Sequence, residues 1–134
     1  LCYMKKYNLF LDDVRFPYCV FKLTILPIYE NNSDWVIVRS YNEFVDTLKE
    51  RGIPSRISFD HDLSYDHYLE INQINEIIYE NLEEKTGYDA AKLLVDMCME
   101  RNEELPMYYV HSANPVGSEN IKKYLENAKK HLTI

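Results

Sequence analysis

Three short apolar runs in this chain each end in side chains that bind cations or move protons. These side chains are Asp12 and Asp13 after the first run, Asp60, His61 and Asp62 after the second, and His111 and Ser112 after the third. Carboxylate oxygens suit Mg²⁺ or Mn²⁺, and imidazoles exchange protons near neutral pH. If the three groups meet in one place, they predict metal-assisted chemistry on a phosphate.

Parallel strands would bring the three groups together. We expect strands at residues 7–13, 35–38, 56–60 and 107–112, because these segments are rich in apolar, β-favouring residues. Helical segments alternate with them, which is typical of a parallel sheet with helices on both faces. In the strand order 2-1-3-4 the first, third and fourth strands are neighbours, and their carboxyl ends lie within roughly 10 Å of one another.

Capping residues predict three helices in the intervening segments. Ser40 and Glu43 form a capping box for a helix that Gly52 ends. Thr86 is expected to cap a helix before the fourth strand, and Ser118 is expected to cap a last helix after it. Each of these segments has apolar residues at helical spacing, so each can bury one face against the sheet.

Two long connections are less regular. Residues 14–34 show no clear helical period, and Val20–Leu26 is either an extra strand or part of an irregular crossover. Residues 64–85 form a polar, acidic insert in which isoleucine and leucine recur at three- and four-residue steps, and this spacing predicts an amphipathic helix. Because the insert directly follows the second polar group, it is either a lid over the site or a surface helix at the sheet edge.

The composition predicts one α/β domain over residues 1–134 that handles a small ligand. The net charge is −7, which argues against long nucleic acid as a partner. The 3 cysteines are odd in number and lack a CxxC spacing, so we expect reduced thiols in a cytoplasmic protein. No apolar run approaches the ~18 residues of a transmembrane helix, so we expect no membrane partner. The composition does not predict an oligomeric state.

Further polar and small residues near the three groups suggest contacts to a phosphate. Arg15 could neutralise charge that develops on a phosphoryl group, and Ser112, with the loop amides beside it, could hold phosphate oxygens. Gly87 allows a close approach to the sheet or to a ligand, and Asn114 lies where a ligand would touch the loop. Purely structural roles remain open for several residues: loop chemistry for Ser112 and Asn114, and helix capping for Asp13 or Asp62.

Four motifs, in this order, resemble the cyclic-phosphate processing receiver-like domains, which are similar to the receiver domains of two-component signalling. The motifs are Leu9–Arg15 with Pro17, Ser58–Leu63, Thr86–Ala91, and Val110–Pro115 with Gly117. The resemblance implies a receiver-like (flavodoxin-like) three-layer α/β fold with a short parallel sheet. No fifth strand ending in lysine is evident, and its absence argues against a receiver-type switch that is phosphorylated on Asp60.

The resemblance also implies an acidic metal pocket and added polar groups that separate this family from signalling receivers. By position, it implies Asp12, Asp13 and Asp60 for the metal pocket, and His61, Asp62, His111 and Ser112 as the additions. Together with the residue chemistry above, the predicted residues are Asp12, Asp13, Asp60 and Asp62 for Mg²⁺ or Mn²⁺; His61, His111, Asp60 and Arg15 for catalysis; and Ser112, Asn114 and Gly87 for substrate.

The leading hypothesis is a metal-dependent phosphoesterase that opens a cyclic phosphate on a nucleotide or an RNA end, in a bacterial or phage conflict setting. Of His61 and His111, one would help the metal to activate water and the other would protonate the leaving oxygen. The alternatives are a binding module that captures a cyclic nucleotide without cleaving it, and a degenerate phospho-acceptor receiver. A metal-dependent nuclease shares the Asp-x-Asp spacing of Asp60 and Asp62, but the net charge of −7 weighs against it.

Overall fold

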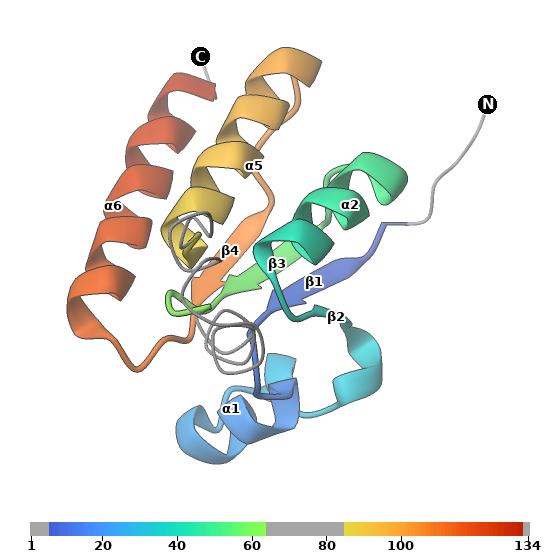
Figure 1. Ribbon diagram of the computed structural model, residues 1–134, viewed down its shortest axis with the longest axis vertical. Coiled ribbons are helices and arrows are strands. Elements are labelled where there is room, and N and C mark those ends of the chain that lie inside the picture. The colour runs from blue at the N-terminus through green and yellow to red at the C-terminus, as the bar shows by residue number, and fades with distance from the viewer. Residues whose placement is uncertain (1–5, 64–84, 133–134) are drawn as a thin grey trace, which may run out of the picture.

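A four-stranded parallel sheet forms the centre of the molecule (Figure 1). The computed structural model describes residues 6–63 and 85–132. Its strands are β1 (Asn8–Leu11), β2 (Val36–Val38), β3 (Arg56–Phe59) and β4 (Met107–Val110). Their spatial order is β2-β1-β3-β4 and every pairing is parallel, which confirms the predicted sheet. Each strand is shorter than predicted, so the charged residues follow the strands and do not belong to them.

The register places the carboxyl ends of three strands level with one another. Leu11 lies opposite Phe59, and Phe59 lies opposite Val110. The hydrogen-bond ladder extends one residue further, because the amide of Asp60 donates to the carbonyl of Leu11 at 2.9 Å and the amide of His111 donates to the carbonyl of Phe59 at 2.9 Å. The residues that follow β1, β3 and β4 therefore start at one edge of the sheet.

Three helices cover one face of the sheet (Figure 1). They are α2 (Tyr41–Arg51), α5 (Gly87–Arg101) and α6 (Pro115–Leu132). Ser40 caps α2, since its hydroxyl oxygen accepts a hydrogen bond from the amide of Glu43 at 3.1 Å. Thr86 starts α5 with a complete capping box. Both predicted caps are confirmed, but the box at Ser40 is not complete, because the Glu43 carboxylate accepts from the amide of Arg39 at 2.8 Å. α5 packs against α2 on one side and α6 on the other.

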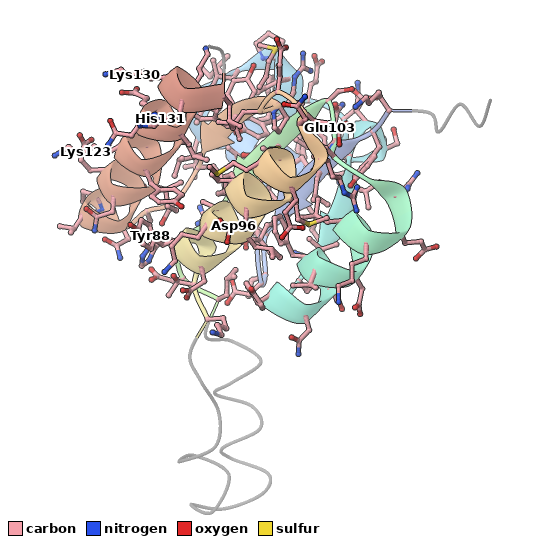
Figure 2. The ribbon with its side chains drawn as sticks, turned by 90° about the horizontal axis from the view of Figure 1, so that it is seen from above. Tyr88, Asp96, Glu103, Lys123, Lys130 and His131 are labelled. Atoms are coloured by element: carbon pink, nitrogen blue, oxygen red, sulfur yellow. The ribbon has the colours of Figure 1, made fainter. Side chains whose placement is uncertain are left out.

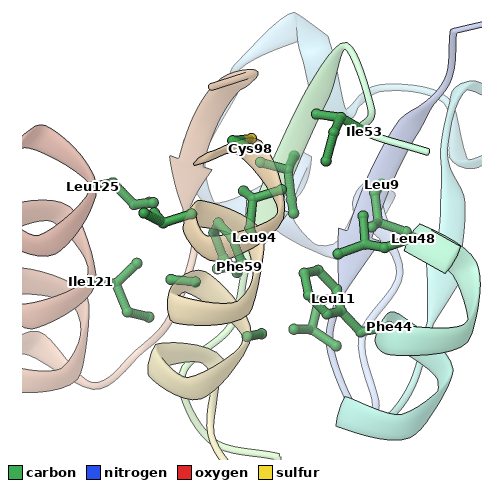
Figure 3. Packing of buried hydrophobic residues seen from close by; sticks show 14 of the residues in the cluster. Leu9, Leu11, Phe44, Leu48, Ile53, Phe59, Leu94, Cys98, Ile121 and Leu125 are labelled. Carbon is green, nitrogen blue, oxygen red and sulfur yellow. The ribbon is translucent and has the colours of Figure 1, made fainter. Parts of the chain in front are cut away.

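An aliphatic core fills the space between these helices and the sheet (Figure 3). Side chains alternate across a strand, so Leu9 and Leu11 of β1 point into this core while Phe10 points to the opposite face. The other large, fully buried members are Phe44, Leu48, Ile57, Phe59, Leu94, Ile121 and Leu125. Burial of each such side chain contributes roughly 1.5–3 kcal/mol, and this burial holds α2, α5 and α6 on the sheet.

An aromatic cluster covers the opposite face. It lies under α1 (Pro17–Thr24) and two short 3₁₀ segments, η1 (Pro27–Tyr29) and η2 (Asn32–Asp34). Phe10 from β1 meets Trp35 edge-on at 5.9 Å, and Trp35 stacks on Tyr29 at 5.6 Å. The molecule therefore has the three predicted layers, with helices on both faces of one sheet (Figure 1).

The segment after β1 contains a helix that the sequence analysis missed. Residues 17–24 form α1, so the alternative of an extra strand at Val20–Leu26 is wrong. Pro17 occupies the first helical turn, where its missing N–H is not needed, and Val20 is buried in the aromatic cluster. The helix has only 8 residues and just 2 buried ones, which is too few for a visible helical period.

The start of the last helix also differs from the prediction. α6 begins at Pro115 and not after Ser118. Asn114 precedes the helix, and its side-chain oxygen accepts a hydrogen bond from the amide of Gly117 at 3.0 Å, as an N-capping residue does. Ser118 instead donates from its hydroxyl to the carbonyl of Ser112 at 3.3 Å. The predicted helical insert at residues 64–85 lies almost entirely outside the described residues.

The outer surface of α6 is basic. Figure 2 shows Lys123, Lys130 and His131 on the side of this helix that faces away from the rest of the molecule, and all three are exposed.

Among residues 6–63 and 85–132 the sheet has no fifth strand after β4. No helix in the same ranges is both long enough and apolar enough to cross a membrane.

A strained residue at the end of α1 offers a test of the fold. Ile25 caps α1 at φ 60° and ψ 17°, a left-handed conformation that costs a side chain with a Cβ about 1–2 kcal/mol. Its side chain is 74% exposed, so substitution loses little packing. We expect Ile25→Asn to raise the free energy of unfolding by about 0.5–1 kcal/mol, measured by urea denaturation.

The control is Ile25→Val, which keeps the β-branched side chain and should give no gain. Asn102 already occupies the equivalent left-handed position after α5, at φ 55°. Equal stabilisation by both substitutions of Ile25 would contradict the strain explanation.

Candidate functional site

Three carboxylates meet where β1 and β3 end. Asp12, Asp13 and Asp60 each offer an oxygen, and these oxygens lie within 4.8 Å of one another. Asp12 is fully buried and Asp60 is only 4% exposed. Their backbones are fixed by the sheet, since the amide of Asp12 donates to the carbonyl of Val38 at 3.1 Å, just as the amide of Asp60 continues the β1–β3 ladder.

Asp12 is held by hydrogen bonds on both of its oxygens. Its Oδ1 accepts from the backbone amides of Val14 at 2.9 Å and Arg15 at 2.8 Å, a loop arrangement that Asp adopts readily. Its Oδ2 lies 3.0 Å from Nε2 of His111 and 3.2 Å from Nε of Arg15. These contacts fix the carboxylate before any ligand arrives.

The two buried carboxylates have opposite pKa shifts. Burial alone would raise the pKa of Asp12, but the hydrogen bonds from His111 and the two loop amides outweigh it and lower the pKa to about 2. Burial and the nearby negative charge of Asp12 raise the pKa of Asp60 to about 6, although Arg15 opposes this shift. Asp12 is therefore ionised near neutral pH, and Asp60 resists becoming the second negative charge.

This donor set fits a divalent cation. Three carboxylate oxygens in one cluster match the preference of Mg²⁺ and Mn²⁺ for oxygen ligands. Burial, followed by the negative charges of Asp12 and Asp13, raises the pKa of Asp60, and a cation placed among these carboxylates would oppose that rise. Arg15 supplies part of the positive charge, because its guanidinium lies 3.8 Å from Oδ1 of Asp60 as well as beside Asp12.

His111 is buried behind the carboxylates, and both of its ring nitrogens have partners. Nε2 lies 3.0 Å from Asp12, and Nδ1 lies 2.6 Å from the hydroxyl of Ser58. The imidazole stacks on Phe10 with ring centroids 4.4 Å apart. Only 1% of its side chain is exposed, and burial lowers its pKa. His111 is thus placed to orient Asp12.

His61 lies on the accessible side of the site. Its Nδ1 is 2.9 Å from Oδ1 of Asp62 and 3.4 Å from the side-chain nitrogen of Asn114, and 19% of its side chain is exposed. Gly117 packs directly against the ring, since a Cβ built there would lie 2.4 Å from Cγ of His61. α6 therefore reaches this imidazole through its first turn.

Gly87 packs against the backbone that carries Asp60. A Cβ at this position would lie 1.8 Å from the carbonyl oxygen of Asp60, and the amide of Gly87 donates to the carbonyl of His61 at 2.8 Å. Only glycine allows α5 to start this close to β3. The structure gives Gly87 a packing role, and its predicted contact with substrate remains a prediction.

Ser112 and Asn114 connect the loop after β4 to the site. A hydrogen bond from Ser112 lowers the pKa of Asp60, acting against burial and the charge of Asp12. The hydroxyl of Ser112 also accepts from the amide of Asn114 at 3.0 Å, so the loop chemistry considered from the sequence is present. A contact of either residue with substrate is not tested by the structure.

The site brings together most of the predicted residues and adds three that the sequence analysis missed. Asp62 stays outside the three-carboxylate cluster, since its side chain is 60% exposed and pairs with His61. The missed residues are Arg39, Ser58 and Tyr29. A serine in the middle of an apolar strand was the available signal for Ser58, because a buried hydroxyl needs a partner.

Arg39 had no such signal in the sequence. Its guanidinium donates to the carbonyls of Asp12 and Arg15 and lies over the ring of Phe16 at 4.5 Å. It therefore ties the loop after β1 to the end of β2, a contact that depends on the strand order.

The raised pKa of Asp60 predicts a fall of stability with pH. Between its ordinary pKa of 3.8 and the shifted pKa of about 6, the folded protein keeps a proton that the unfolded chain has released. The free energy of unfolding therefore falls as the pH rises through this window. We expect Asp60→Asn to remove the fall and to raise the free energy of unfolding near neutral pH by about 1–3 kcal/mol.

Urea denaturation at several pH values between the two pKa values checks this expectation. The lowered pKa of Asp12 acts in a separate window, since its stabilisation is present above 3.8 and is lost toward about 2. Asp46→Asn, an exposed carboxylate on α2, is the matched control and should leave the slope unchanged. A slope that persists in Asp60→Asn would contradict the assignment.

The two buried glycines predict different consequences of adding one methyl group. In Gly117→Ala the new methyl group would meet the His61 ring. This ring belongs to a side chain and can rotate away, so we expect the protein to remain folded. In Gly87→Ala the methyl group meets the backbone of Asp60, and we expect the free energy of unfolding to drop by about 1–3 kcal/mol. Urea denaturation, with the His61 ring resonances followed by NMR, separates the two, and equal destabilisation would refute the distinction.

Comparison with known protein families agrees with the geometry of this site. The chain matches the family described as the cyclic-phosphate processing receiver domain over residues 7–127. Comparisons with curated proteins and with solved structures gave no significant match. The matched range contains all four strands and the carboxylate cluster. Because the match covers nearly the whole chain, this protein belongs to the family of cyclic-phosphate processing receiver domains.

Proposed function

We propose that this protein is a metal-dependent phosphodiesterase that hydrolyses a cyclic phosphate of a nucleotide or an RNA end. Water adds across one P–O bond of the ring, which yields a phosphomonoester and a free hydroxyl group. The observation that carries the proposal is the cluster of Asp12, Asp13 and Asp60, with the partly exposed His61 following Asp60 directly in the chain. The family to which the chain belongs supports a role connected with cyclic phosphates.

The three carboxylates are the groups that would hold Mg²⁺ or Mn²⁺. When bound, such a cation supplies charge stabilisation for the phosphoryl oxygens and lowers the pKa of water. Asp12 suits this role because it is already ionised and fixed by its hydrogen bonds. A bound cation would lower the pKa of Asp60, because its positive charge would offset the effects of burial and of the nearby charge of Asp12. Asp60 would then be ionised and able to bind the cation.

His61 is the side chain better placed to move a proton during the reaction. Its side chain is partly exposed, and the carboxylate of Asp62 lies within hydrogen-bond distance of its Nδ1 and can orient the ring. His111 is buried with both nitrogens engaged, so we assign it to orientation and not to proton transfer. The Arg15 side chain is 28% exposed and lies next to two carboxylates, so its guanidinium can also pair with an incoming phosphate. The hydroxyl of Ser112 can donate a hydrogen bond to the same phosphate.

The charge of the protein favours a small substrate. With 22 acidic residues against 15 lysines and arginines, the chain does not attract a long phosphate backbone. A single cyclic phosphate presents little charge and can be compensated locally by Arg15 and a divalent cation. A cyclic mononucleotide, a cyclic dinucleotide or a terminal cyclic phosphate meets this condition.

One observation favours a second function, capture of the cyclic phosphate without cleavage. Hydrolysis uses a general base and a general acid, whereas only one of the two predicted catalytic histidines is accessible. A binding module would keep the same contacts and would release the ligand unchanged. Ligand binding would then raise the melting temperature as the ligand concentration rises.

Hydrolysis assays distinguish these functions. Purified protein is incubated with 2′,3′-cyclic, 3′,5′-cyclic and cyclic dinucleotide phosphates, with MgCl₂, MnCl₂ or a chelator, and the products are identified by mass spectrometry. We expect metal-dependent opening of at least one compound, and a loss of roughly 100-fold or more in Asp60→Asn and in His61→Ala. His131→Ala, which removes an exposed imidazole at the end of α6, is the matched control and should retain full activity.

Two outcomes would contradict the phosphodiesterase. A thermal shift with the ligand recovered intact would establish the binding module instead. A gain of phosphate mass from acetyl phosphate that Asp60→Asn abolishes would indicate a receiver-type phospho-acceptor.

A further inference from the structure

A chain of buried hydrogen bonds leads from the aromatic cluster to the carboxylate site. The hydroxyl of Tyr29 lies 2.6 Å from the hydroxyl of Ser58, and Ser58 lies 2.6 Å from Nδ1 of His111. On the other side of the ring, Nε2 of His111 lies 3.0 Å from Oδ2 of Asp12. The four side chains come from η1, β3, the end of β4 and the end of β1, so only the folded sheet assembles them.

All four side chains are shielded from water. Tyr29 is 2% exposed, Ser58 and Asp12 are fully buried, and the His111 side chain is 1% exposed. Phe10 stacks on the His111 ring at 4.4 Å. In such surroundings a polar group without a hydrogen-bond partner is unfavourable, because water does not reach it. The order of donors along the chain is therefore well defined.

The chemistry of the end groups sets that order. An ionised carboxylate only accepts, so Nε2 of His111 must carry hydrogen and donate to Asp12. Nδ1 lies 2.6 Å from the hydroxyl of Ser58 and, in this order, accepts a hydrogen bond from it. The Ser58 oxygen in turn accepts from the phenol of Tyr29, whose pKa burial raises to about 12. Every donor then points toward Asp12.

The reverse order does not satisfy the same groups. If Nδ1 of His111 carried hydrogen, it would donate to Ser58 and Ser58 would donate to Tyr29. The phenol of Tyr29 would then need another acceptor, and within residues 6–63 and 85–132 its hydroxyl has no hydrogen-bond partner other than Ser58. The surroundings thus select one tautomer of His111, with its hydrogen on Nε2.

We propose that Tyr29 and Ser58 are positioning residues, which hold the Nε2–H tautomer of His111 and through it aim Oδ2 of Asp12 at a divalent cation. This inference rests on the metal-binding role of Asp12 in the proposed function. It does not require turnover, because its consequences are a tautomer and an affinity. Residues that orient a metal ligand in this way commonly change metal affinity by about 10–100-fold when they are removed.

The first readout is the tautomer of His111. Two-bond ¹H–¹⁵N correlation NMR on histidine-labelled protein distinguishes the Nε2–H from the Nδ1–H form, and His111→Gln assigns the signal among the 4 histidines. We expect the Nε2–H pattern in the wild-type protein and a mixture of forms in Ser58→Ala. A merely structural serine would leave the tautomer unchanged.

The second readout is affinity for the metal alone. Isothermal titration calorimetry with MgCl₂ or MnCl₂ should show affinity about 10–100-fold weaker in Ser58→Ala and a smaller loss in Tyr29→Phe. Tyr109→Phe is the matched control, because Tyr109 packs against the same aromatic cluster but is not a member of the hydrogen-bond chain. Ser58→Thr keeps the hydroxyl and should restore the affinity. Urea denaturation of each variant confirms that it is folded.

The outcomes separate this inference from the proposed function. An Nδ1–H pattern in the wild-type protein, or unchanged metal affinity in a folded Ser58→Ala, would overturn the positioning role while leaving the metal site in place. Wild-type protein that binds neither cation would overturn the metal site and the inference with it. Wild-type protein that binds metal, with weaker binding in Ser58→Ala, but hydrolyses no compound would support the inference and refute only the phosphodiesterase.

Discussion

The parallel pairing of β1 with β3 is the constraint on which the site depends. It brings two buried aspartates, Asp12 and Asp60, to the same edge of the sheet, where their negative charges repel. Arg15, the loop amides and His111 all act to stabilise the charge of Asp12. Asp60 receives less help, and the difference between their pKa values follows from this unequal support. Two carboxylates arranged in this way favour a cation that binds to both of them.

The two faces of the sheet contribute to the site in different ways. On the aliphatic face, α5 and α6 start within van der Waals reach of the site because Gly87 and Gly117 have no side chain. This close approach brings the helix starts to Asp60 and His61. On the aromatic face, Phe10 and Tyr29 surround His111 with rings and exclude water. One face therefore determines where the helix starts lie, and the other encloses the buried histidine.

The two histidines illustrate how burial separates residues that are equivalent in the sequence. Both come just after an apolar strand, His61 after β3 and His111 after β4. His61 remains partly exposed and pairs with the exposed carboxylate of Asp62. His111 is enclosed between Asp12, Ser58 and Phe10, so its hydrogen bonds are committed to other protein groups. Burial and neighbours from other strands thus give the two histidines different surroundings, although both come directly after the sheet.

The sequence by itself determined the α/β class and the three polar groups that follow the strands, because continuous apolar runs, capping residues and short-range spacing are local properties. The predicted strand order is not a local property; it came from the general rule that connections between parallel strands are right-handed. It also predicted the caps at Ser40 and Thr86. It missed α1, whose short length hides a helical period, and it placed the start of α6 at Ser118 although Asn114 acts as its cap.

Only the tertiary structure decided which charges are buried and which polar groups touch. His111 is separated in the sequence from Asp12 by 99 positions and from Ser58 by 53 positions, yet it contacts both. Tyr29 reaches Ser58 from a segment that shows no clear helical period. The pKa of each aspartate depends on burial and on neighbours from other strands. Such quantities arise when distant segments pack together, so no local pattern encodes them.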